Sequence, residues 1–393
     1  MFLYKKIIVP LGVFFYIVSC VASQDDVCKA VAHSPLRILF VVSNFPAPSQ
    51  IFILNIITGL IDAGHDVSIF SFHKSEKKDF MHPNIKKYKL LDRVIYETFP
   101  QPLPDSDIVF CQFGYVGKKI TDMKRLRKWL KKRRLVVCFR GADLTKRVQE
   151  NPTLYKDMFN RADLILPVCD YFKQRLIGLG CHLDKIVVHH SAINCSQFFF
   201  SVKQKPENDI VRLISVCRLV KKKGIDYAIK AVARVVEEHP NIHFTIVGDG
   251  PERIYLELLI RQLKLQDKVS LYGWASQKEI VSLLQQSHIF LLPSRTASDG
   301  NEEGIANALK EAMAMGLISV ATWHAGTPEL IDDGVSGFLV SEKNSKELAR
   351  AIKKVIEHPE IWESMALAAR KKIEDEFETR ASVKKLEKLF YTL

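Results

Sequence analysis

The segment of residues 288–316 constrains the fold of this chain more than any other part. Residues 288–292 form a short apolar run that predicts a buried strand, and Pro293 ends it. A polar loop, residues 294–302, leads into a helical pattern over residues 304–315. A strand, a long polar loop and a helix make up the unit of an open α/β sheet, and ligands bind such sheets at the carboxyl ends of their strands.

Two carboxylates mark this predicted helix, Glu303 at its start and Glu311 further along. The helical rise between them is about 12 Å, so we expect them to contact different parts of one elongated ligand rather than a shared metal ion. The free backbone N–H groups of Gly304, Ile305 and Ala306 suit a phosphate or sugar oxygen. From the residues alone, the alternative is that Glu303 only interacts favourably with the positive end of the helix dipole and that Glu311 lies on the surface.

The same alternation of apolar runs and helical patterns recurs on both sides of residues 199–209, a polar segment that we interpret as a linker. Further helical patterns cover residues 51–63 and 170–179. Repeated units of this kind predict an α/β fold of two Rossmann-like domains, residues 36–200 and 208–375, facing across a cleft. The apolar runs predict parallel strands over residues 36–43, 65–72, 107–114, 135–143, 163–167, 185–193, 243–250 and 269–274, and from Ile210.

A second candidate anion site follows the strand that begins at Ile210. Arg218 and Lys223 stand between the end of this strand and Gly224, which opens a helix. Two cations at such a turn can cradle an anion. We expect the neighbouring Lys221 and Lys222 to be solvated.

These segments together resemble the retaining glycosyltransferases of family 4, also called glycosyl transferases group 1. Glu303 and Glu311, with seven residues between them, are similar to the EX7E motif of that family, and residues 318–340 resemble the segment that follows it. Arg218 and Lys223 match its "GRl..kKG" pattern, although Cys217 stands at the usual glycine. The resemblance covers about residues 36–390. Within the family, the chain is similar to the bacterial polysaccharide and colanic-acid-type glycosyltransferases.

The resemblance implies a GT-B fold in which a C-terminal helix, residues 376–393, packs back on the N-terminal domain. It implies a metal-independent, retaining transfer of a sugar from a UDP- or GDP-linked donor to a glycan or lipid-linked acceptor, in the synthesis of cell-envelope polysaccharide or glycolipid. No cofactor other than the donor substrate is expected.

The resemblance also assigns roles to residues. Arg218, Lys223 and Glu303 are the expected catalytic residues, with the two cations neutralising the departing diphosphate and Glu303 binding sugar hydroxyls. Glu311 is expected to bind the ribose. The remaining expected donor-binding residues are Gly248, in a GDGPER segment that resembles the family's "G.GP", and Gly304, Ile305 and Ala306.

On the acceptor side the expected residues are Ser49, with Gln50 beside it, Arg140 and Asp143. The segment FRGAD resembles the family's "fRG.D", and Arg140 stands where many relatives have histidine. An arginine there can bind a phosphate or carboxylate through two hydrogen bonds. Asp143 is expected to cap the next helix.

Two more residues near the expected donor site have open alternatives. Trp274 is expected either to flank the nucleotide base or simply to pack in the core. Glu329 is expected either to cap its own helix or to contact the donor. His189 and His190 are expected to be packing or loop residues, because no third metal ligand stands near them.

The chain is strongly basic, with a formal net charge of +13, which favours anionic partners. Residues 124–134 carry much of this charge, and their apolar residues fall at helical spacing. This pattern predicts a basic amphipathic helix on an anionic membrane; the alternative is a solvated helix whose apolar stripe packs on the sheet. Nucleic acid is not an expected partner. The expected membrane-binding residues are Lys124, Arg125, Arg127, Lys128, Trp129, Lys131 and Lys132.

The N-terminal segment, residues 1–30, is signal-like or a membrane anchor, because two lysines precede the apolar run of residues 7–22. Either interpretation conflicts with a nucleotide-sugar donor, which implies the cytoplasmic face of a membrane. A start codon assigned too far upstream would remove the conflict. The eight cysteines show no metal-type spacing and are expected to be buried thiols of a reducing compartment.

Three other functions stay open at this stage. One is another GT-B enzyme, such as a phosphorylase or an epimerase. A second is a non-catalytic sugar-binding or membrane-surface protein, against which the intact Arg218, Lys223, Glu303 and Glu311 argue. A third is an NAD-dependent oxidoreductase, which the missing third glycine of GxGxxG disfavours.

Overall fold

The computed structural model describes residues 34–47, 50–74, 82–97, 102–206 and 210–393, and residues 36–393 form one compact unit. The expected signal-like segment therefore lies outside the described residues. Among the residues that are described, no helix is both long and apolar enough to cross a membrane.

The N-terminal half is built on a six-stranded sheet whose strand order is β3-β2-β1-β4-β5-β6. Every pair of neighbours is parallel. β1 is the hydrophobic centre of this sheet, since its residues from Ile38 to Val42 are all buried. The strands are β1 (Arg37–Phe45), β2 (Asp66–Lys74), β3 (Val94–Tyr96), β4 (Ile108–Gln112), β5 (Arg134–Phe139) and β6 (Leu164–Pro167).

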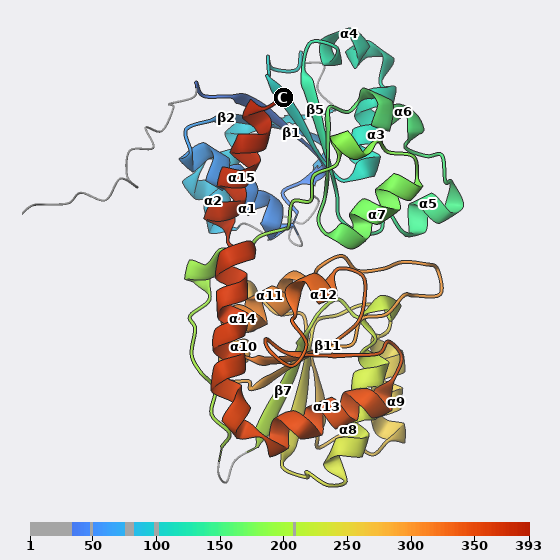
Figure 1. The fold of residues 1–393 in the computed structure, drawn as a ribbon, viewed down its shortest axis with the longest axis vertical. Coiled ribbons are helices and arrows are strands. Elements are labelled where there is room, and N and C mark those ends of the chain that lie inside the picture. The colour runs from blue at the N-terminus through green and yellow to red at the C-terminus, as the bar shows by residue number, and fades with distance from the viewer. Residues whose placement is uncertain (1–33, 48–49, 75–81, 98–101, 207–209) are drawn as a thin grey trace, which may run out of the picture. The chain divides into compact units, whose positions relative to one another are not determined.

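Helices cover both faces of this sheet, as Figure 1 shows. The largest of them is α1, which buries seven of its twelve residues. The α-helices are α1 (Ile51–Asp62), α2 (Pro83–Lys87), α3 (Gly114–Asp122), α4 (Arg127–Leu130), α5 (Lys146–Glu150), α6 (Lys156–Arg161) and α7 (Asp170–Gly178). Short 3-10 helices are η1 (Leu90–Arg93), η2 (Lys124–Leu126), η3 (Leu183–Lys185) and η4 (Cys195–Gln197).

The C-terminal half contains a second six-stranded parallel sheet, in the order β12-β11-β10-β7-β8-β9. β7 pairs with β8 on one side and β10 on the other, so the order reverses between β7 and β10. Such a reversal opens a crevice at the carboxyl ends of the two strands. The strands are β7 (Val211–Val216), β8 (Ile242–Val247), β9 (Val269–Gly273), β10 (Ile289–Leu292), β11 (Ile318–Thr322) and β12 (Phe338–Val340).

The helices of this half also lie on both faces of its sheet (Figure 1). They are α8 (Ile225–Val236), α9 (Arg253–Gln262), α10 (Gln277–Gln285), α11 (Asn307–Ala314), α12 (Thr327–Leu330), α13 (Ser345–Glu357), α14 (Trp362–Glu376) and α15 (Thr379–Tyr391), with 3-10 helices η5 (Lys221–Lys223) and η6 (Pro359–Ile361). The predicted α/β class with two Rossmann-like sheets is thereby confirmed.

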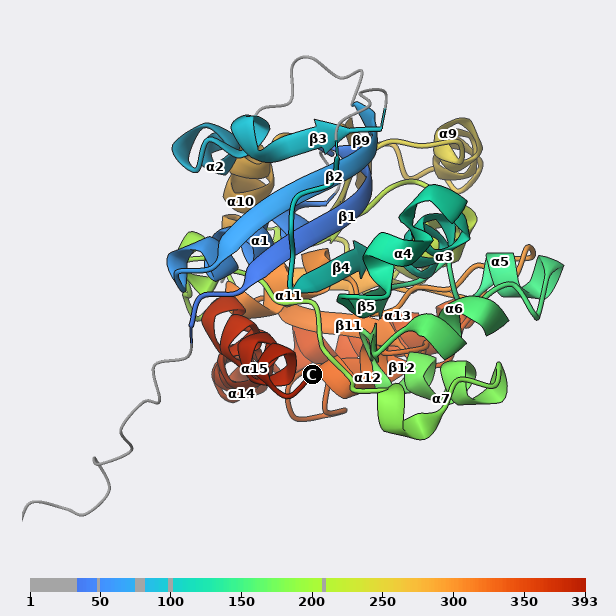
Figure 2. The same ribbon diagram turned by 90° about the horizontal axis from the view of Figure 1, so that it is seen from above.

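The last helix, α15, does not belong to the sheet that precedes it in the chain. It lies along α1, where a Cβ on Gly59 would come within 2.6 Å of Val383. The His65 imidazole of the N-terminal half contacts the Glu387 carboxylate at 3.0 Å. Seen from above in Figure 2, strands β3, β2, β1 and β4 run side by side. Figure 1 shows that α15 continues from the end of α14 to the N-terminal sheet.

Two local predictions are wrong. Residues 185–193 were expected to begin as a strand, but they contribute only two isolated bridges, Ile165 to Ile186 and Ile193 to Glu378. The basic segment was expected to be one helix, but it consists of η2 and the single turn α4. No acidic residue occurs among residues 124–134, so no ion pair within the segment offsets the repulsion between its cations.

Candidate active site

The candidate site lies at the carboxyl ends of β7 and β10, where the strand order of the C-terminal sheet reverses. The loop after β7 carries Arg218 and Lys223, and the loop after β10 carries Glu303. Gly224 joins the two loops: it has a φ of +62°, and a Cβ there would lie 1.9 Å from the Pro293 carbonyl oxygen. Only glycine permits both this backbone conformation and this approach.

Glu303 is held by two lysines of η5. Its Oε2 lies 2.7 Å from the Lys223 Nζ and 3.5 Å from the Lys222 Nζ. Burial opposes ionisation of Glu303, but Lys223 and Lys222 outweigh it and hold the pKa of this carboxyl at about 2. Glu303 is therefore a carboxylate at neutral pH. Its single negative charge lies beside the positive charges of two lysines.

Lys222 was expected to be solvated, and that prediction is wrong. Its side chain is only 13% exposed, and its Nζ donates to the Glu302 carbonyl oxygen at 3.0 Å. The 3-10 turn of η5 directs both Lys222 and Lys223 toward the β10 loop. Lys221 is exposed, as expected.

Arg218 differs from the two lysines, because it is exposed and its side chain makes no hydrogen bond or ion pair with another described residue. It is near enough to Lys222 to disfavour the charged form of that lysine, whose pKa is lowered mainly by burial. The guanidinium is thus a cation at the mouth of the site with all its donors available for a ligand.

The backbone of Glu303 is fixed by a relay that the sequence did not indicate. The Glu303 N–H donates to His324 Nε2 at 3.0 Å, so the proton of this neutral imidazole is on Nδ1, which contacts the Glu342 carboxylate. The other oxygen of Glu342 accepts from the Thr296 N–H at 3.0 Å. His324 is buried, and nothing in its local sequence distinguishes it from a packing residue.

The helix that follows Glu303 begins later than expected. α11 begins at Asn307, and its N-cap Ala306 has extended backbone angles. Gly304, Ile305 and Ala306 therefore precede the helix, and the predicted helical start at these three residues is wrong. Gly304 packs closely against the N-terminal half, since a Cβ there would lie 3.0 Å from the Arg140 carbonyl oxygen.

Glu311 lies on α11, and its side chain is hydrogen-bonded to Gln277, the first residue of α10. Burial raises the pKa of Glu311 to about 7, while Lys310 and a hydrogen bond from Gln277 oppose the rise. Its environment is therefore opposite to that of Glu303, which is ionised at all ordinary pH values.

Gly248 and Trp274 lie at the carboxyl ends of β8 and β9. Gly248 has a φ of +130°, and a Cβ would lie 1.9 Å from the Cys217 carbonyl oxygen. Its N–H already donates to the Gly273 carbonyl at 2.7 Å, so this glycine allows close approach rather than offering a free amide. Trp274 is 69% exposed, which makes the packing alternative for it wrong.

The expected acceptor-side residues differ in what they can offer. Ser49 lies outside the described residues, and Gln50 precedes α1 without a side-chain cap. The buried Asp143 accepts from the main-chain N–H groups of Gly114, Arg140 and Gly141. It joins the ends of β4 and β5, and it does not cap α5, whose N-cap is Thr145.

Two carboxylates of the C-terminal half bind groups of the N-terminal half. Glu329 accepts from the N–H groups of Asp170 and Tyr171, at 2.9 and 3.2 Å, at the start of α7. Neither expectation for Glu329, a cap of its own helix or a donor contact, describes these bonds. Glu302, which is buried, pairs with Arg175 at 3.0 Å.

His189 and His190 have the packing role expected of them. The His189 Nε2 contacts the Ser382 carbonyl oxygen at 3.1 Å. The ring of His190 stacks on Phe377 with a centroid distance of 4.7 Å, and its Nε2 lies 3.3 Å from Glu329.

The basic segment presents its cations to solvent and turns its tryptophan inward. All six predicted membrane-binding lysines and arginines are exposed, and we call them the basic patch. Trp129 is partly buried against the core, with the Arg133 guanidinium 4.2 Å from its ring centroid. The apolar stripe therefore packs against the protein, as the alternative interpretation expected. The charges of the basic patch remain available to an anionic surface.

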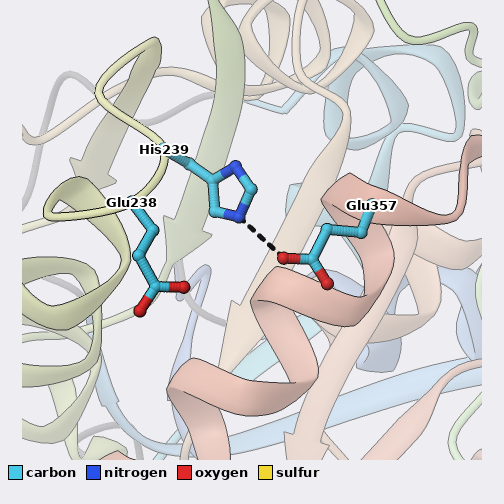
Figure 3. A group of neighbouring side chains, drawn as sticks. All are labelled: Glu238, His239 and Glu357. Carbon is cyan, nitrogen blue, oxygen red and sulfur yellow. Dashed lines mark hydrogen bonds and ion pairs between the residues drawn. The ribbon is translucent and has the colours of Figure 1, made fainter.

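One group of side chains in the described part of the chain has the spacing of metal ligands, namely Glu238, His239 and Glu357 (Figure 3). Glu238 and His239 precede β8, so they lie at the amino ends of the strands, opposite to the candidate site. Glu238 is paired with Lys353, and His239 with Glu357 at 2.9 Å. These ion pairs explain why the three side chains lie together. The group is not part of the candidate active site.

Comparisons with known proteins give the family of the chain. Residues 196–372 match the family model described as "Glycosyl transferases group 1". The chain is 30% identical to the amylovoran biosynthesis glycosyltransferase AmsK of Erwinia amylovora, over 91% of this chain and 100% of AmsK. It is also 30% identical to the putative colanic acid biosynthesis glycosyltransferase WcaL of Salmonella typhimurium, over 91% and 100% of the two chains.

Solved structures share the fold at lower identity. HepE of Anabaena in complex with UDP superposes with a TM-score of 0.75 at 19% identity, over 91% of this chain and 100% of HepE. Sucrose-phosphate synthase of Thermosynechococcus elongatus gives a TM-score of 0.73 at 16% identity, over 91% and 98% of the two chains.

Proposed function

Because the chain belongs to the glycosyl transferases group 1 family and is a glycosyltransferase, we propose that it moves a sugar from a nucleotide-sugar donor to a glycan or lipid-linked acceptor. The observation that carries the proposal is the contact of Lys222 and Lys223 with Glu303 at the strand-order reversal, with the unpaired Arg218 close to Lys222. Such a group of cations suits a diphosphate, whose charge grows as the bond to the sugar breaks.

We propose the retaining chemistry that the family resemblance implies, with these residues acting in it. The bond between the anomeric carbon and the diphosphate oxygen breaks, and the acceptor hydroxyl forms the new bond on the same face, so that configuration is retained. The proton of that hydroxyl passes to the departing diphosphate. Arg218 and Lys223 stabilise the leaving charge, which is the task that a metal ion performs in other enzymes, and we propose that no metal or cofactor is needed.

The ion pair between Lys223 and Glu303 positions both side chains before the donor binds. In the free protein Lys223 contacts Glu303 at 2.7 Å. A diphosphate offers Lys223 a second anion, and Glu303 can then accept hydrogen bonds from the hydroxyls of the sugar. The lysine thus holds the carboxylate ionised and placed before the donor binds.

A uridine donor and a role in polysaccharide synthesis are supported by the relatives. HepE of Anabaena was solved with UDP and with UDP-glucose, and the names of AmsK and WcaL refer to amylovoran and colanic acid biosynthesis. We therefore propose a UDP-sugar as donor and a cell-envelope polysaccharide or its lipid-linked precursor as product.

Binding of UDP by the full chain is the first expected result, measured by calorimetry beside GDP. We expect Glu311→Gln to weaken UDP binding by about 10-fold or more, because a hydrogen bond from a ribose hydroxyl to a carboxylate contributes about 1.5–3 kcal/mol. With a pKa of about 7 for Glu311, the affinity should rise more between pH 6 and pH 8 in the wild type than in the variant. The UDP phosphate and Lys310 also titrate in this range, and they do so in both proteins. If neither nucleotide binds, the non-catalytic alternative replaces the transferase proposal.

For the location of the protein, we propose that the basic patch holds it on the anionic, cytoplasmic face of a membrane. The six cations are exposed on one short segment, and each contributes about 1 kcal/mol near such a surface. A lipid-linked acceptor would then be reached by a protein that rests on the surface where that acceptor lies.

Removal of charge from the basic patch is expected to weaken binding to vesicles that contain anionic lipid by on the order of 100-fold or more. The test variant replaces four lysines of the patch by serine, and the control variant replaces four exposed cations elsewhere by serine. Both variants keep residues 1–30. Equal loss in the control would show that net charge, and not the patch, drives binding. The test positions are Lys124, Lys128, Lys131 and Lys132, and the control positions, also exposed, are Lys278, Lys346, Arg350 and Lys384.

A further inference from the structure

Two cations, the buried Lys310 and the partly buried Arg140, meet where the two halves of the chain contact each other. Both are hydrogen-bonded to one residue, Ser191. The Arg140 guanidinium donates from Nη1 to the Ser191 hydroxyl, and the Lys310 Nζ donates to the Ser191 carbonyl oxygen. Arg140 follows β5 in the N-terminal half, while Lys310 lies on α11, directly before Glu311, and is completely buried. The contact therefore brings a cation from each half to one place.

No described carboxylate lies within ion-pair distance of either cation. Asp143 is close to Arg140 in the chain, but its oxygens accept from main-chain N–H groups. Aromatic rings lie against both cations, because Arg140 lies over the ring of Phe52 at 4.4 Å and Lys310 over that of Phe377 at 5.7 Å. Burial and the charge of Arg140 lower the pKa of Lys310 to about 7, although the carboxylates of Glu311 and Glu303 act in the opposite direction.

Several N–H donors at this place also have no protein acceptor. Gln112, at the end of β4, is completely buried, and its Oε1 accepts from the Arg140 Nη2 at 2.8 Å. Its Nε2 has no hydrogen-bond partner among the described residues, and the same is true of the buried Nε of Arg140. Buried donors and unpaired buried cations are both rare in folded proteins without a ligand.

We propose that Arg140, Lys310 and Gln112 form a binding site for an anionic group, a carboxylate or a phosphate, of the acceptor substrate. The inference rests on the proposed glycosyl transfer and adds the class of acceptor. A carboxylate or phosphate offers oxygens to an arginine and an amide at once and supplies the missing negative charge. A neutral sugar hydroxyl would satisfy the donors without balancing the charges.

The position favours the acceptor over the leaving group. The diphosphate has its own cations, Arg218, Lys222 and Lys223, on the loop after β7 of the C-terminal sheet. Gln112 ends β4 and Arg140 follows β5 of the other sheet, and Lys310 reaches them from the helix that carries Glu311. Two of the three residues thus come from the half that does not carry the diphosphate cations.

The test measures binding of three small probes to the full chain saturated with UDP: methyl glucuronide, glucose 1-phosphate and the neutral methyl glucoside. We expect one of the anionic probes to bind about 10- to 150-fold more tightly than the neutral one, the range for hydrogen bonds to charged groups. Lys310→Met and Arg140→Gln should each abolish this preference. Two variants are used because either substitution alone could disturb folding, and UDP binding serves as the control for an intact donor site.

Three results would contradict the proposed acceptor anion site. Equal binding of the charged and neutral probes by the wild type would overturn the anion site. A preference that survives in both variants would overturn the assignment to Arg140 and Lys310. Tighter binding of UDP-glucuronate than UDP-glucose, with no preference among the three probes, would move the anion to the donor sugar and overturn the acceptor assignment. Failure of UDP itself to bind would refute the proposed function instead.

Discussion

Replacing Arg218 by alanine is expected to lower the turnover number by about 10²- to 10³-fold, the usual effect of removing one group that stabilises developing charge. The free energy of unfolding should change by less than about 0.5 kcal/mol, since the exposed side chain of Arg218 has no hydrogen-bond or ion-pair partner among the described residues. A large loss of activity without loss of stability is the signature of a group that acts only on the substrate. Steady-state kinetics with a UDP-sugar and chemical denaturation measure the two quantities.

The matched control is Lys221→Ala, which removes an exposed cation from the same loop. Lys221 does not contact Glu303, whereas Lys222 and Lys223 do. We expect the control to retain turnover within a few-fold of the wild type. Near-normal turnover of Arg218→Ala, or equal losses in the two variants, would remove Arg218 from the catalytic residues.

Gly224→Ala is expected to have the largest effect on stability, about 2–5 kcal/mol of the free energy of unfolding. A left-handed backbone costs a residue with a Cβ about 1–2 kcal/mol, and overpacking against the Pro293 carbonyl adds about 1–3 kcal/mol. The added Cβ would lie 1.9 Å from that oxygen, so the two loops of the site must separate. UDP affinity should fall as well, because Lys223 is the adjacent residue.

Gly180→Ala provides the comparison for this prediction. Gly180 has a φ of +85°, but a Cβ there would meet nothing within 4 Å. Its substitution should cost only the backbone term, about 1–2 kcal/mol, and leave UDP binding unchanged. Equal destabilisation by the two substitutions would mean that the contact with Pro293 relaxes freely and does not hold the loops together.

The sequence was informative wherever a signal is local. Long apolar runs such as residues 36–43 predicted β1, and the residue types of Arg218, Lys223 and Glu303 indicated an anion site that the fold does assemble. β3 was missed because three residues, Val94–Tyr96, carry no periodicity. The run of residues 185–193 misled because its apolar residues pack beside β6 without forming a ladder.

Contacts between distant residues could not be predicted in this way. Three consecutive lysines are equivalent in sequence, and only the turn of η5 separates the solvated Lys221 from the buried Lys222. Glu329 satisfies N–H groups 159 and 158 residues away in the chain. Lys310 stands in an apolar helix, and its relation to Arg140 exists only because the two halves meet.

The placement of α15 has a consequence for how the chain is made. Phe390 packs edge-on against Phe110 of β4, at a centroid distance of 5.5 Å, and Val383 fills the space above Gly59. A domain that folds during synthesis needs its covering elements to have left the ribosome. The first sheet to be translated is therefore the last to be covered, because its final helix is supplied only after the whole second sheet. During that interval Phe110 lacks its contact with Phe390, and we expect this part of the sheet to bind chaperones that recognise hydrophobic surface.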